Sequence, residues 1–173
     1  MKLITKKTHL LVVSTSIISM NIQATTFSQD IVGVWEARCF PVYDLQFQTI
    51  VNFNSTMLTI SPQFNVSSYV KVYDANDRDC ASDYQSIQLN SRFVIQEADY
   101  SIDGFPIQFI DIETQNVNPA TVRWNQSPTI FSIGLIDNDI LYLGQSTIDH
   151  SGRDADSRHN QLNMDAPFYR ALQ

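Results

Sequence analysis

The sequence is dominated by short runs in which apolar and polar residues alternate with a period of two. Between residues 86 and 96, for example, Leu89, Phe93 and Ile95 fall on one face, opposite Asn90 and Arg92. Side chains of a β-strand point alternately to the two faces of a sheet, so each run predicts a strand with one buried face. The predicted strands span residues 31–39, 46–53, 56–61, 66–73, 85–97, 105–116, 129–136, 139–144 and 162–169.

Clusters of Asn, Asp, Gly, Pro and Ser separate these strands and predict tight turns. They fall at residues 54–55, 62–65, 74–79, 99–104 and 136–139. Eight to ten sequential strands joined in this way predict an all-β fold, an antiparallel meander that either closes into a barrel or folds into a sandwich. Closure is favoured because it leaves no exposed sheet edge. The long polar stretch 149–160 is interpreted as a solvated loop.

The first 24 residues have the order of regions expected of a secretory signal peptide. Lys2, Lys6 and Lys7 precede an apolar run from Leu10 to Met20, and the small residue Ala24 closes a polar stretch. The apolar run is short for a bilayer-spanning helix, which needs about 20 residues. We therefore expect cleavage near Ala24, bacterial export to the periplasm or the medium, and a single mature domain over residues 25–173.

The mature chain is strongly acidic. Three of the 11 basic residues belong to the signal, and all 18 acidic ones follow it, so the formal net charge is 8 − 18 = −10. This charge makes nucleic acid and anionic membrane surfaces poor partners. No second apolar run predicts a membrane span.

The only two cysteines, Cys39 and Cys80, both lie in the exported part. An even count in an oxidising compartment favours a disulfide over a metal site or a nucleophile. Closing a loop of this length stabilises a fold by about 4 kcal/mol in the chain-entropy model.

The first predicted strand carries Gly33, Trp35 and Cys39 on one face. We expect Trp35 to fill the barrel interior near one end, Gly33 to allow a bend or a close approach, and Cys39 to reach Cys80 from the same inner side. The Gly-x-Trp pattern in the first strand of a secreted all-β chain resembles the calycin group, the lipocalins and their relatives. That resemblance implies a lipocalin-like barrel in which a basic residue near the last strand, here Arg170, packs across the tryptophan. The expected contact is structural and of the cation–π type.

The sequence contains few candidate catalytic or metal-binding residues. His150 and His159 lie near acidic residues, but at no spacing typical of a metal site, and no nucleophile elbow is present. Asp111 and Glu113 share a strand face, which is expected to face solvent because acidic side chains are seldom buried unpaired. We therefore expect no enzyme activity, no metal and no cofactor.

Aromatic residues are the candidates for a binding site inside the barrel. They either line a pocket for a small apolar or amphipathic ligand or fill a solid core, and the pattern does not separate these alternatives. A second hypothesis is a cell-envelope protein-binding or protease-inhibitor module, with residues 25–30 as an extended arm, by resemblance to periplasmic metalloprotease inhibitors. The candidate ligand-lining residues are Phe47, Phe53, Phe93, Phe109 and Tyr142.

Overall fold

The computed structural model describes residues 27–44, 46–118 and 128–172, and the predicted signal peptide lies outside them. These residues form one helical turn and eight strands, which confirms the all-β fold. No helix among them is long and apolar enough to cross a membrane. The strands are β1 (Gly33–Tyr43), β2 (Ile50–Ile60), β3 (Asn65–Tyr73), β4 (Gln85–Tyr100), β5 (Pro106–Asn118), β6 (Thr129–Asp137), β7 (Ile140–Leu143) and β8 (Phe168–Arg170).

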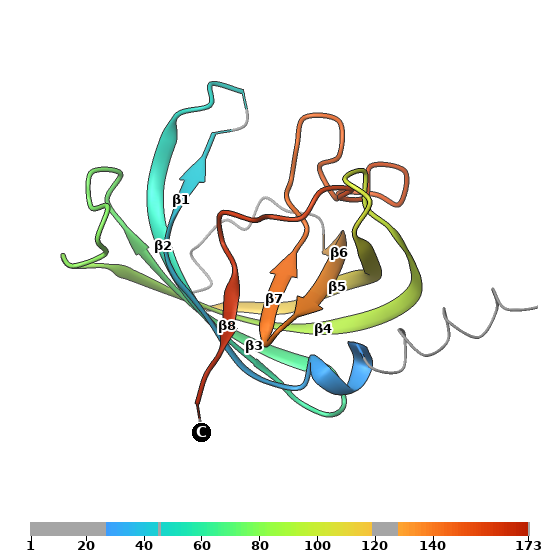
Figure 1. Ribbon diagram of the computed structural model, residues 1–173. Helices are drawn as coiled ribbons and strands as arrows, with labels where there is room; N and C mark the ends of the chain where they lie inside the picture. The colour runs from blue at the N-terminus through green and yellow to red at the C-terminus, as the bar shows by residue number, and fades with distance from the viewer. Residues whose placement is uncertain (1–26, 45, 119–127, 173) are drawn as a thin grey trace, which may run out of the picture.

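The strands form a closed barrel (Figure 1). Each strand pairs antiparallel with the next one in the chain, and β8 pairs with β1 to complete the circle. The predicted closure is therefore confirmed, and the architecture is compatible with that of the lipocalins. The β6–β7 hairpin turn shows the local chemistry that the sequence indicates, because Asn138 and Asp139 both have the positive φ angles that tight hairpin turns require.

Two predicted strand boundaries are wrong. Asn54 and Ser55 do not form a turn but lie inside β2, where they pair with Val72 and Lys71 of β3. Ladder pairing on both sides of β2 overrides the local turn preference of these two residues. The last strand is only three residues long, because most of the predicted segment 162–169 runs in an irregular conformation before it reaches β1.

The start of the described chain is a helical turn over residues 27–30 and not an extended arm. Phe27 is only 8% exposed and packs into the barrel core, and the Ile31 amide donates to its carbonyl oxygen at 2.9 Å. The expectation of a projecting arm is therefore wrong for residues 27–30, because burial of Phe27 holds this segment against the barrel. Thr25 and Thr26 lie outside the described residues.

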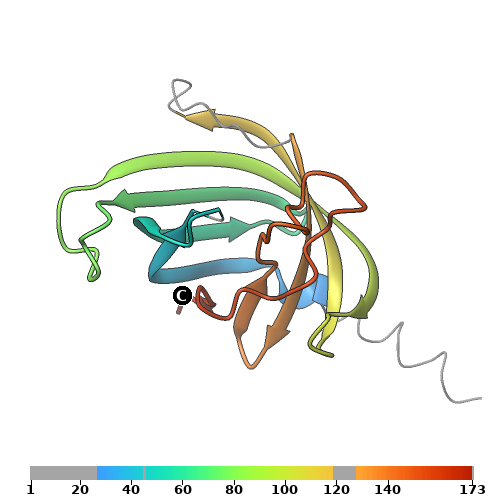
Figure 2. The same cartoon turned by 90° about the horizontal axis from the view of Figure 1, so that it is seen from above.

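The barrel has two different ends. One, which we call the Trp35 end, carries the helical turn and the short turns at residues 61–64, 101–105 and 138–139. The other, which we call the loop end, carries the longer connections at residues 44–49, 74–84 and 144–167. The last of these folds back over the outside of the sheet beside β5 and β6 (Figure 2).

Two clusters of buried side chains stabilise the fold, and they lie on opposite faces of the sheet. The interior cluster fills the barrel near the Trp35 end, and the outer cluster lies between the sheet and the β7–β8 segment. Members of the interior cluster are Phe27, Ile31, Trp35, Ala37, Leu58, Ile60, Val66, Phe93, Ile110, Leu141 and Phe168. The buried members of the outer cluster are Ile107, Ile133 and Leu162.

Candidate functional site

The floor of the barrel is built on Trp35. Its side chain is completely buried, and its indole Nε1 donates to the backbone oxygen of Ile31 at 2.7 Å. The Arg170 guanidinium lies 4.2 Å from the centre of the indole ring, and β8 places Arg170 directly opposite Trp35 in the ladder. The contact expected from the resemblance to calycins is therefore present, and the barrel is sealed at this end.

Arg170 also ties three segments together. Its Nε pairs with the Asp139 carboxylate at 2.9 Å, and its two terminal nitrogens donate to the backbone oxygens of Val32 and Asp30 at 3.1 and 2.6 Å. Gly33 makes this arrangement possible. It has a φ of +142°, and a Cβ at this position would lie 3.0 Å from an Arg170 terminal nitrogen. The close approach expected at Gly33 is thus that of the arginine side chain.

Toward the loop end, the side chains that face the barrel interior are less buried than Trp35 and Leu58. Leu58 and Ile60 of β2 belong to the interior cluster, so alternation places Asn54 and Asn52 on the same inward face. Their neighbours on the adjoining strands also point inward and are only half-buried, whereas Trp35, Leu58 and Ile60 are buried. These half-buried inward positions are Val42, Asn52, Asn54, Val70, Val72 and Ile87. Solvent therefore reaches into the barrel from the loop end.

Asn52 and Asn54 carry the polar atoms of this inner surface. The side-chain oxygen of each is shielded from solvent and has no hydrogen-bond partner among the described residues. Buried polar atoms are nearly always hydrogen-bonded, and an exception needs an explanation such as a bound water or ligand. The two amides sit in a wall of aliphatic side chains, which is the composition typical of small-molecule sites.

A cleft of about 530 Å³ opens at the loop end between the β1–β2 connection and the start of the β7–β8 segment. Tyr43, Asp44 and Gln48 line one side, and residues 145–149 line the other. The volume falls in the range of small-ligand pockets, which is roughly 300–1,000 Å³. The cleft therefore gives the loop end a recess of suitable size.

Only one of the five aromatic residues predicted to line the barrel belongs to the interior cluster, and that residue is Phe93. Phe47 is 68% exposed in the β1–β2 connection. Phe53 is buried, but it pairs with Tyr73 on the face opposite Asn54. The prediction is wrong for Phe47 because it lies in a connection outside β2, and for Phe53 because the inward face of β2 is the even-numbered one.

Phe109 and Tyr142 also lie outside the barrel interior. Both pack against the outer cluster, while their chain neighbours Ile110 and Leu141 belong to the interior cluster. The prediction is wrong here because β5 and β7 are buried on both faces. An aromatic residue on such a strand fills a core whichever way it points.

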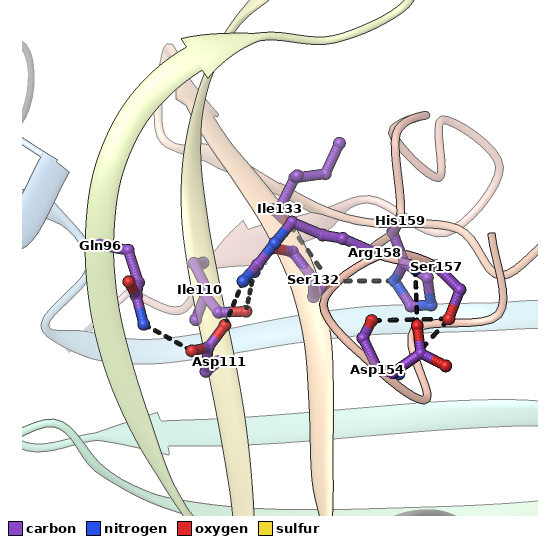
Figure 3. A network of polar contacts seen from close by, with 9 residues as sticks. All are labelled: Gln96, Ile110, Asp111, Ser132, Ile133, Asp154, Ser157, Arg158 and His159. Carbon is purple, nitrogen blue, oxygen red and sulfur yellow. Dashed lines mark hydrogen bonds and ion pairs between the residues drawn. The ribbon is translucent and has the colours of Figure 1, made fainter.

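The polar stretch 149–160 is only in part the solvated loop that its composition predicts, because residues 153–156 are exposed but Arg158 and His159 pack against the barrel. Arg158 lies on the outer wall of the barrel, where its guanidinium pairs with the Asp111 carboxylate at 2.7 Å (Figure 3). The two side chains are only 15% and 13% exposed. The solvent-facing expectation is thus wrong for Asp111, whereas Glu113 is exposed.

Further contacts hold Arg158 in place. Its guanidinium lies 4.8 and 5.3 Å from the ring centres of Phe109 and Phe131 and donates to the Ser132 backbone oxygen at 2.9 Å. The Asp111 carboxylate also accepts a hydrogen bond from the Gln96 amide. An ion pair covered by two aromatic rings is well shielded from water, so it anchors the β7–β8 segment to β5 and β6.

His159 completes this anchor. It is 7% exposed, its Nδ1 lies 3.1 Å from the Ser132 hydroxyl, and its backbone amide donates to the Phe131 carbonyl. Burial is the main cause that lowers the pKa of the imidazole, and the charges of Arg158 and His150 lower it further. His159 is therefore neutral at pH 7 and has a structural role. The described residues contain no group of three or more His, Cys, Asp or Glu able to hold a metal.

The predicted disulfide is confirmed. Cys39 and Cys80 are bonded, with their Cα atoms 5.7 Å apart, and the bond fastens the β3–β4 loop to β1. A register shift between Ala37 and Phe40 brings Phe40 against the interior cluster, so Cys39 does not share the inward face of Trp35 as expected. A β-bulge of this kind leaves no clear sequence signal.

Comparison of the chain with protein-family models, curated proteins and solved structures finds no significant match. Function therefore has to be inferred from the geometry of the barrel itself.

Proposed function

We propose that this chain is a non-enzymatic, lipocalin-like barrel that binds a small amphipathic molecule in its interior, entered from the loop end. The observation that carries the proposal is the contrast between the two halves of the barrel. Trp35, Leu58 and Ile60 are buried, whereas the inward positions of β2 and β3 from Asn54 and Val70 toward the loop end are half-buried. A sealed floor below a solvent-reached upper half is the arrangement that a ligand-holding barrel needs.

The inner surface indicates the chemistry of the ligand. The half-buried inward positions are aliphatic or amide side chains and carry no charge. The shielded oxygens of Asn52 and Asn54 are acceptors, so they favour a ligand that presents an N–H or O–H donor. The ligand class is therefore a neutral, mainly apolar molecule with at least one donor group.

The proposal includes export to an oxidising compartment, the bacterial periplasm or the medium. The Cys39–Cys80 disulfide supports it, because such bonds persist outside the reducing cytosol. Membership of the calycin group is part of the same proposal. It is supported by the closed eight-stranded barrel and by the contact of Arg170 with Trp35.

Fluorescence titration with N-phenyl-1-naphthylamine, a neutral aromatic amine with one N–H donor, tests the proposal. Val70→Trp places a large ring in the barrel interior and should weaken binding at least tenfold, a ratio that corresponds to about 1.4 kcal/mol. Asn54→Leu removes an acceptor at similar volume and should weaken binding about threefold to tenfold. The matched control is Thr59→Trp, which adds the same ring on the outer face of β2 and should leave binding unchanged.

Equal affinity in Val70→Trp and Thr59→Trp would reject the interior as the site. No binding to the unmodified chain, together with capture of a protein partner by the folded barrel, would favour the protein-binding hypothesis instead.

A further inference from the structure

A second cavity, of about 420 Å³, lies at the Trp35 end between β5 and β6. The last ladder pair between these strands joins Gln108 to Gly134. Beyond it, Pro106 and Ile107 pair with β4, while residues 135–137 pair with β7. The two strands therefore separate, and the described residues provide no ladder pair across the gap.

This cavity is separate from the barrel interior. The Phe27 ring lies against Gly134, so closely that a Cβ on Gly134 would come within 3.0 Å of it and within 2.6 Å of Ile110 of the interior cluster. Gly134 thus leaves room for the Phe27 ring, and that ring forms the inner wall of the cavity. A molecule bound here would not reach the half-buried positions near the loop end.

The lining combines aromatic and aliphatic surface with negative charge. Phe27 and Phe105 contribute rings, Ile107 and Leu135 contribute aliphatic surface, and Gln108, only 3% exposed, contributes a buried amide. The Gln108 amide donates to the Gln96 backbone oxygen, which leaves its own oxygen as an acceptor.

Two carboxylates, Asp30 and Asp137, stand at the rim. Neither forms an ion pair with another described residue, whereas the nearby Asp139 is paired with Arg170. None of the described residues that line the cavity carries a positive charge. Two carboxylates that have no ion-pair partner and lie beside aromatic rings attract a cation, which can lie over a ring face while it interacts with the acids.

We propose that this cavity binds a small organic cation with an apolar body, of the arylalkylammonium class. The apolar part would lie between Phe105 and Leu135, and the ammonium group would face Asp30 and Asp137. The volume is sufficient for such a molecule.

The probe for this site is 3-phenylpropylammonium, and its neutral counterpart is 3-phenylpropan-1-ol, in an NMR titration of the folded protein. For about ten non-hydrogen atoms, a Kd of about 1–10 mM is expected. Backbone amide signals of Phe105, Ile107 and Gln108 and of residues 135–137 should shift with the cation. The alcohol should bind at least fivefold more weakly, because it lacks the charge.

The variant Asp30→Asn/Asp137→Asn should weaken cation binding about tenfold and leave alcohol binding unchanged. The control Asp79→Asn/Asp83→Asn changes the net charge equally in the β3–β4 loop, far along the chain from the cavity lining, and should have less than a twofold effect. Ala98→Leu, which narrows the cavity, should weaken both probes.

Val70→Trp separates this proposal from the function proposed above, because it should weaken naphthylamine binding at least tenfold but leave cation binding intact. Equal affinity for the cation and the alcohol, equal effects of the two double variants, or shifts confined to the β2–β3 interior positions would each overturn the cation site.

Discussion

The Arg158–Asp111 pair gives the sharpest test of how the β7–β8 segment is held on the barrel. Both side chains are about seven-eighths buried, and the guanidinium also contacts two phenylalanine rings and two backbone oxygens. Breaking a buried pair from one side leaves the other charge uncompensated and typically costs 3–5 kcal/mol. Arg158→Ala should therefore lower the free energy of unfolding by about 3–5 kcal/mol.

Urea unfolding followed by tryptophan fluorescence measures this loss. The double variant Arg158→Ala/Asp111→Ala should lose less than the sum of the two single variants, because the second change removes the stranded charge. The matched control is Arg153→Ala, an exposed arginine of the same segment, with an expected change within about 0.5 kcal/mol. A loss below about 1 kcal/mol in Arg158→Ala, or strict additivity in the double variant, would refute the role assigned to the pair.

Three further predictions concern the floor, the buried histidine and the disulfide. Arg170→Ala should lower the free energy of unfolding in urea by about 2 kcal/mol. Arg170→Lys should restore only part of this stability, because lysine cannot stack on Trp35 and donate to the two carbonyls as the guanidinium does. Full stability in Arg170→Lys would contradict the role assigned to the guanidinium. The lowered pKa of His159 means that the unfolded chain binds its proton more strongly, so stability should fall as the pH drops below about 6.5. His159→Gln should make the stability depend less on pH below about 6.5. An unchanged dependence of stability on pH would argue against a lowered pKa of His159. Cys39→Ser/Cys80→Ser should lose up to about 4 kcal/mol relative to the oxidised protein in thermal or urea unfolding, and an equal stability would show that the bond constrains little.

The parts of the fold that follow from local patterns were predictable from the sequence. Alternation in β4 places Leu89, Phe93 and Ile95 on one face, and the Asn138–Asp139 turn has the dipeptide chemistry of a hairpin. The contact of Arg170 with Trp35 was found only through the resemblance to calycins. The alternation in β4 and the Asn138–Asp139 turn depend on short segments whose residues determine their own geometry.

The features that the sequence did not reveal depend on contacts between distant segments. Alternation cannot tell that Phe109 points outward, because a second hydrophobic cluster covers that face of β5. The residues around Arg158 predict a polar loop, and no local sequence pattern indicates that Arg158 pairs with Asp111 on the barrel wall. Asn54 has the local chemistry of a turn, and only pairing with β3 places it inside a strand and on the inward face.

We infer that the barrel is sealed at Trp35, and we propose that it is hollow toward the loop end. A crystal structure of the protein grown with N-phenyl-1-naphthylamine tests it most directly. We predict density for the naphthyl ring inside the barrel, between Val70 and Asn54, with the amine directed at an asparagine oxygen. An interior closed by packed side chains up to the loop end, with the probe absent or bound on the outer wall, would contradict the account.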